Sequence, residues 1–73
     1  MSYIVHTKPG CSYCDNTKVL LLTTGAQFQE VPYVTTEQQG MFKAEYGPNA
    51  SWPRIYQGDR HIGGYTELAA ELR

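Results

Sequence analysis

The sequence predicts a small mixed α/β fold with a four-stranded sheet flanked by three helices. Short runs rich in β-branched and aromatic residues alternate with a helical pattern in the first half. A glycine-containing turn joins two short strands near the end, and an amphipathic helix closes the chain. The predicted order is β-α-β-α-β-β-α. Its strand–helix–strand start implies a parallel pair joined by a right-handed crossover, and the hairpin must be antiparallel, so the sheet is mixed.

The first half of the chain is predicted to form a strand, a helix and a second strand. Residues 2–7 form the first strand, which a Pro-Gly pair breaks. The helix runs from Ser12 or Tyr13 to Thr24, and Gly25 is placed to end it. The second strand covers residues 28–34, and Pro32 places it at a sheet edge because proline lacks a ladder donor. The helix is expected to be buried over much of its surface, because its apolar positions exceed a narrow stripe: Tyr13, Val19, Leu20, Leu21 and Leu22.

The second half is predicted to form a helix, a hairpin and a closing helix. Residues 35–36 precede two glutamines at the spacing of a capping box, and the helix that they open runs to about Tyr46. Gly47-Pro48 ends that helix. Residues 54–56 and 60–62 flank a Gln-Gly-Asp turn and form the hairpin. The closing helix starts near residue 65 and has apolar residues at the positions i, i+3, i+4 and i+7: Tyr65, Leu68, Ala69 and Leu72.

Length and charge limit the classes of function. The 73 residues are expected to form a single domain over residues 1–73. A formal net charge of −1 provides no long-range attraction to nucleic acid or to an anionic membrane. The longest apolar run, Val19 to Leu22, is too short to span a bilayer. Met1 leads directly into a polar stretch with no secretory signal, so we predict a cytoplasmic location.

The two cysteines carry the predicted chemistry. A disulfide between Cys11 and Cys14 closes a loop too short to add much stability, so the pair is expected to be catalytic or metal-binding. Cys11 lies where the loop becomes helix, and there the free N–H groups and the helix dipole stabilise a thiolate. Lys8 adds a positive charge nearby. Cys11 is therefore predicted to be the nucleophile, and Cys14, one turn deeper, to attack the mixed disulfide that forms on Cys11.

The cysteine pair has two other interpretations, a zinc site and an interaction domain. A zinc site needs four ligands, and the chain offers only His6 and His61 beside the two cysteines, so redox chemistry is favoured. His6 is expected to be structural and His61 solvated. An interaction domain with inert cysteines stays open at this point. An unshifted pKa of the Cys11 thiol in an alkylation titration would favour the interaction domain.

Three separated blocks resemble the glutaredoxin family over nearly the whole chain, and its small size is most similar to phage-encoded members. Residues 8–14, K-P-G-C-S-Y-C, resemble the family's K-x-x-C-P-Y-C. Residues 51–56, S-W-P-R-I-Y, resemble T-V-P-x-V-F, and residues 61–68, H-I-G-G-Y-T-E-L, resemble I-G-G-x-x-D-L. The resemblance implies a thioredoxin-like fold. It also implies reduction of protein disulfides and glutathione mixed disulfides, with roles in electron transport and cell redox homeostasis.

The resemblance also implies a glutathione groove. Pro53 would be the family's cis-proline and would turn the backbone of Trp52 toward a substrate strand, although the local sequence alone favours an ordinary trans proline. Lys8 would pair with the glycyl carboxylate of glutathione, and Tyr13 would line the groove or, without the family, pack in the core. Gly63 and Gly64, before the last helix, would let the γ-glutamyl carboxylate approach the backbone. Without the resemblance, this glycine pair would be interpreted as a simple turn. The implied binding residues are Lys8, Tyr13, Trp52, Pro53, Gly64, Tyr65 and Thr66.

Glutathione would be a co-substrate, with no tightly bound cofactor and no metal. The implied partners are glutathione and disulfide-bearing proteins, with ribonucleotide reductase as the family's example, and the chain is expected to be a monomer. Ser12 replaces the family's usual proline, which leaves a glutathione-ligated iron–sulfur carrier as an alternative. Trp52 replaces a small aliphatic residue, and Tyr65-Thr66 replaces a small or acidic pair. A thioredoxin-like reductant fed by a flavin reductase is a further alternative, against which Tyr13 and the short chain argue.

Overall fold

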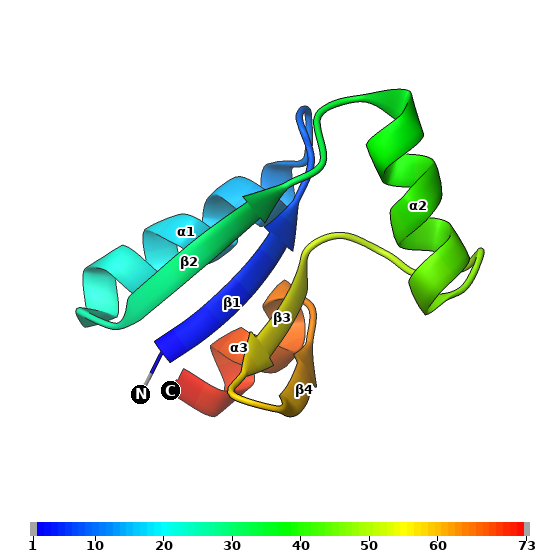
Figure 1. Cartoon of the computed structure of the whole chain (residues 1–73). Helices are drawn as coiled ribbons and strands as arrows, with labels where there is room; N and C mark the ends of the chain where they lie inside the picture. Colours follow the sequence, from blue (N-terminus) through cyan, green and yellow to red (C-terminus); the bar gives the residue numbers. More distant parts are fainter. Residues whose placement is uncertain (1, 73) are drawn as a thin grey trace.

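The computed structural model describes residues 2–72, which fold in the predicted order β-α-β-α-β-β-α (Figure 1). All element bounds agree with the sequence prediction to within two residues, and only the second strand differs by more than one residue. The arrangement is the thioredoxin-like fold, with a mixed sheet and three helices. The elements are β1 (Ser2–Thr7), α1 (Ser12–Thr24), β2 (Gln27–Pro32), α2 (Thr36–Tyr46), β3 (Arg54–Gln57), β4 (Arg60–Gly63) and α3 (Tyr65–Leu72).

The sheet has the strand order β2-β1-β3-β4, with β1 at its centre beside β3. β1 pairs in parallel with β2 and antiparallel with β3, and β3 pairs antiparallel with β4. β2 is an edge strand, as Pro32 predicts. It ends at Pro32 rather than at Val34, because only Tyr33 continues the pairing, through its N–H to the carbonyl of Thr7 at 2.9 Å. The next two backbone N–H groups donate instead to the side chain of Gln38, at 2.8 and 3.0 Å.

The hydrophobic core lies between the sheet and the helices α1 and α3. Figure 1 shows both helices behind the sheet, while α2 stands apart at one end. One residue from each of four elements is completely buried there: Val5, Leu21, Ile55 and Leu68. Val5 and Ile55 face each other across β1 and β3, so their side chains point to the same side of the sheet. This core attaches α1 to the sheet through Leu21, and the cysteines lie at the other end of that helix.

The prediction that α1 is buried over much of its surface was wrong. Val19 and Leu22 are 61% and 69% exposed, because no second layer covers the outer face of α1. The buried stripe consists of Cys14, Thr17 and Leu21. The Thr17 hydroxyl donates to the carbonyl one turn earlier at 2.8 Å, which allows a polar side chain to be fully buried.

Local capping signals predict the helix ends correctly. Gly25 follows α1 with φ of 74°, the left-handed conformation that a glycine adopts without strain. Thr35 is the N-cap of α2 and forms a capping box with Gln38, in which each side chain meets the other's backbone. No helix within residues 2–72 is long and apolar enough to cross a bilayer.

The helix α2 is attached to the other face of the sheet by aromatic side chains. Phe42, its one buried residue, is 1% exposed and stacks on Trp52 with ring centroids 3.7 Å apart. His6 is nearly buried and shares a 2.9 Å hydrogen bond between its Nδ1 and the hydroxyl of Tyr33, so the prediction of a structural histidine is confirmed. Burial and the charge of Arg54 lower the pKa of His6. We call this group the aromatic cluster; its members are His6, Tyr33, Phe42, Tyr46, Trp52 and Tyr56.

Candidate functional site

The cysteine pair lies at the start of α1, directly after the loop that follows β1. Cys11 is the N-cap residue, in an extended conformation with φ of −103° and ψ of 104°. It forms a disulfide with Cys14, with the two Cα atoms 5.2 Å apart. Cys11 is partly exposed, whereas Cys14 is only 1% exposed. A substrate sulfur therefore reaches Cys11 first, and Cys14 meets only what is already bonded to Cys11.

The backbone at this helix start supports a negative charge on the outer sulfur. The N–H of Cys14 donates to Sγ of Cys11 at 3.1 Å, in the position where a capping side chain normally accepts. The positive end of the α1 dipole lies at the same place. Hydrogen bonding and dipole thus both favour the thiolate of Cys11 over its thiol, and the thiolate is the form that attacks a disulfide.

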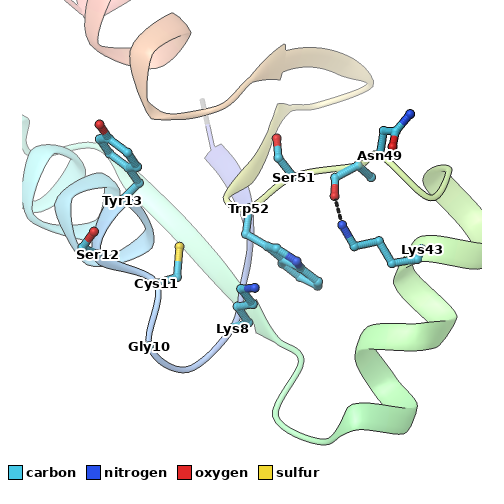
Figure 2. Close-up of a pocket in the computed structure, with 10 residues that line it drawn as sticks. Lys8, Gly10, Cys11, Ser12, Tyr13, Lys43, Asn49, Ser51 and Trp52 are labelled. Carbon is cyan, nitrogen blue, oxygen red and sulfur yellow. Dashed lines mark hydrogen bonds between the residues drawn. The ribbon is translucent and has the colours of Figure 1, made fainter.

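An open pocket of about 460 Å³ lies beside Cys11 (Figure 2). Lys8 and residues 10–13, from the loop and the first turn of α1, form one wall, and residues 49–52 together with Lys43 of α2 form the other. The ammonium of Lys8 lies 5.9 Å from the centroid of the Trp52 ring. Trp52 in turn packs on Tyr33 and Phe42 of the aromatic cluster, so the pocket floor is held by packing.

A second, smaller pocket of about 280 Å³ continues the first on the side of α3. The two share Tyr13, Ser51 and Trp52, and together they form a groove that passes Cys11. The peptide bond between Trp52 and Pro53 is cis, as the family resemblance implies. All seven predicted glutathione-binding residues line the groove: Lys8 in the first pocket, Tyr13 and Trp52 in both, and Pro53, Gly64, Tyr65 and Thr66 in the second.

Tyr13 and Tyr65 join the two helices at the rim of this groove. Their rings stack with centroids 5.7 Å apart and an interplanar angle of 26°. Tyr13 remains 58% exposed, so it is a surface residue of the groove and not part of the core. The sequence alone left this choice open.

The structure adds Glu67 to the residues that line the groove. Its carboxylate accepts the N–H of Gly64 at 2.7 Å, as a residue in the first turn of a helix does toward its N-cap. Gly63 has φ of 125°, and a Cβ there would lie 2.9 Å from the side chain of Glu67. One of the backbone donors expected to bind an anion is therefore used by the chain's own carboxylate. The three-residue spacing from Gly64 to Glu67 was the signal that could have shown this.

Two other charged residues have structural partners. Arg54 lies 4.2 Å from the centroid of the Tyr46 ring, and its Nε donates to the hydroxyl of Tyr56 at 3.0 Å. Arg60 pairs with Glu71 of α3. Within residues 2–72 no three His, Cys, Asp or Glu side chains are grouped in a way that could hold a metal ion.

Comparisons with known proteins agree on one family. The Glutaredoxin family profile matches residues 4–62. Glutaredoxin 3 of Escherichia coli is 32% identical over 66 residues, which cover 90% of this chain and 80% of that protein. Glutaredoxin 1 of Francisella tularensis, solved with cacodylate, superposes with a TM-score of 0.85 at 29% identity, covering 97% of this chain and 91% of the other. A buckwheat glutaredoxin–glutathione complex superposes with a TM-score of 0.82 over 97% of this chain and 67% of the other, and its 24% identity shows the shared fold alone.

Proposed function

Because this chain belongs to the glutaredoxin family, we propose that it reduces disulfides with electrons taken from glutathione. The family and the redox-active pair Cys11–Cys14 make it a thiol–disulfide oxidoreductase. One observation carries the proposal of glutathione as reductant. The exposed member of the pair, Cys11, opens into a groove that every residue expected to bind glutathione also lines.

The geometry supports a two-step exchange. The thiolate of Cys11 attacks one sulfur of a substrate disulfide, forms a mixed disulfide with it and expels the other sulfur as a thiolate. Cys14 then attacks Sγ of Cys11 and releases the second substrate thiolate. The substrate gains two electrons, and the enzyme is left with the disulfide seen in this structure. The shallow burial of Cys11 and deep burial of Cys14 suit this order of attack.

Glutathione would return the enzyme to its dithiol form. One glutathione thiolate opens the Cys11–Cys14 bond and becomes bonded to Cys11, and a second releases it as oxidised glutathione, so that two glutathione molecules supply the two electrons. Lys8 lines the first pocket and would meet the glycyl carboxylate, and N–H groups of the first turn of α3 would meet the γ-glutamyl carboxylate. The buckwheat glutaredoxin, which shares this fold, was solved with glutathione bound.

The test is the reduction of a small glutathione mixed disulfide, coupled to glutathione reductase and NADPH. Cys14→Ser is expected to keep this activity but to lose most of its activity on protein disulfides, because only the second reaction needs the buried thiol. Cys11→Ser is expected to lose both. No turnover by a folded wild-type chain would overturn glutathione as the reductant, and equal activity of Cys11→Ser and wild type would overturn the assignment of roles.

The physiological targets follow from the same proposal. The substrates would be disulfide-bearing proteins of the cytoplasm, with ribonucleotide reductase as the first candidate to assay. Reduction of a purified candidate protein, followed by loss of its disulfide in mass spectrometry, tests each one separately.

A further inference from the structure

We propose that this chain prefers disulfide substrates with acidic residues beside the reactive cysteine, and that Lys43 is the residue that selects them. The inference rests on the proposed function, because it names the substrate class of the same site. Lys43 is on α2, remote in sequence from the cysteines, yet it lines the pocket beside Cys11 together with Lys8. In the view of Figure 2 the two lysines lie on either side of the Trp52 indole.

The ammonium of Lys43 is held at the pocket wall. It donates to the carbonyl of Ala50, in the loop that leads to Trp52 (Figure 2). An ammonium group has three N–H donors, so this contact leaves two for a ligand. A carbonyl oxygen also carries no formal charge, so the positive charge of Lys43 is not neutralised there.

The pocket is cationic although the chain as a whole is not. Within residues 2–72 the ion pairs use Lys18 and Arg60, and neither pocket lysine is in one. Among the described residues no Asp or Glu lines this pocket, so two positive charges face it in a chain of formal net charge −1. A pocket of one charge sign favours ligands of the opposite sign and raises their rate of encounter.

A peptide substrate meets both charges during the first exchange step. While a peptide cysteine is bonded to Cys11, the peptide itself occupies the groove and no glutathione is present. Lys8 and Lys43 then face the peptide residues that run past Trp52 toward α2. Glutathione has a carboxylate for Lys8, but Lys43 is left for side chains that only a longer substrate carries. Lys43 is therefore a specificity residue and not part of the basal glutathione reaction.

The test compares three peptides of equal length, each with one internal disulfide. The residues beside the cysteines are Glu in the first, Gln in the second and Lys in the third. We expect kcat/KM of the wild type to fall in that order, and the differences to shrink at high salt because ions screen partly exposed charges. Lys43→Gln is expected to reduce the preference for the Glu peptide over the Gln peptide about three- to fivefold, mainly through KM.

Two further variants test whether Lys43 acts through its charge or only by supporting the loop that contains Ala50. Lys43→Arg keeps the charge and should keep the preference. Lys18→Gln removes a lysine of α1 that pairs with Glu30 and does not line the pocket, and it should also keep the preference. Turnover of a small glutathione mixed disulfide should be unchanged in all three variants.

The outcomes are distinguishable. An active wild type that reduces the three peptides equally overturns the inference and leaves the proposed function intact. A Lys43→Gln variant that slows all three peptides by the same factor also overturns it, because Lys43 then only supports the loop. Failure of the wild type on the small glutathione mixed disulfide overturns the proposed function instead.

Discussion

Phe42 is expected to be the residue that holds α2 and the pocket floor in place. Its ring is 1% exposed, and its nearest aromatic rings are Trp52 at 3.7 Å, Tyr46 at 5.0 Å and Tyr33 at 5.1 Å between centroids. Truncating a buried phenylalanine to alanine costs about 3–5 kcal/mol. A chain of 73 residues has a free energy of unfolding of roughly 4–11 kcal/mol at the usual value per residue. Phe42→Ala is therefore expected to remove between about a quarter and all of the free energy of unfolding.

The assay is urea denaturation followed by circular dichroism and by the fluorescence of Trp52, the chain's only tryptophan. Two controls bracket the result. Phe42→Leu keeps an apolar side chain at the site and should cost about 1–2 kcal/mol, and Leu22→Ala, at a position 69% exposed, should cost less than about 0.5 kcal/mol.

Phe42→Ala is also expected to change the pocket beside Cys11. Trp52 loses its stacking partner in Phe42→Ala, so its fluorescence should change in the folded state and KM for a glutathione mixed disulfide should rise. A free energy of unfolding no lower than that of Leu22→Ala would refute the role given to Phe42.

Other predictions concern backbone conformation and titration. Gly40→Ala should stabilise the chain by about 0.5–1 kcal/mol in urea denaturation, because Gly40 lies within α2 and an added Cβ meets nothing within 4 Å. Gly25→Ala has equal space but a backbone φ of 74°, so it should destabilise the chain by about 1–2 kcal/mol. Equal effects of the two substitutions on the free energy of unfolding would contradict this reasoning. The hydrogen bond from Thr7 lowers the pKa of Glu30 below 4.5, so ionised Glu30 adds to the free energy of unfolding above pH 4.5, and this stabilisation is lost as the pH falls through the lowered pKa. In Glu30→Gln, Tm should therefore fall less steeply as the pH is lowered. Burial lowers the pKa of His6 below 6.5, so the unfolded chain takes up a proton that the folded chain does not, and stability should fall as the pH drops below 6.5. An unchanged slope of Tm against pH in His6→Gln would count against that linkage.

Much of the fold was predictable because its signals act over one or two helical turns. Gly25 and the Thr35–Gln38 box end and begin helices through backbone groups within four residues of themselves. Pro32 predicts the edge strand for an equally local reason, the missing N–H. The error over α1 has the opposite origin, because the exposure of Val19 and Leu22 depends on whether another layer covers the helix.

Some residues of the candidate site were also predictable from local motifs, and others were not. The three motif blocks indicated the seven residues expected to bind glutathione, and these all line the groove. Their roles, the monomeric state, the single domain over residues 1–73 and the cytoplasmic location remain predictions. Glu67 was missed although its spacing from Gly64 is a local signal, while Lys43 has no signal near the cysteines at all.

The sequence by itself determined the order of the elements, their caps and the place of Cys11 at a helix start, because neighbouring residues set each of these. Only the tertiary structure decided that Cys14 is almost completely buried, that Trp52 stacks on Phe42, and that a lysine of α2 faces the pocket of Cys11. Those facts depend on the sheet order and on the packing of Phe42, which bring together segments some 30 residues apart in the chain. Contacts between such distant segments leave no periodic trace in either segment, so the sequence pattern could not show them.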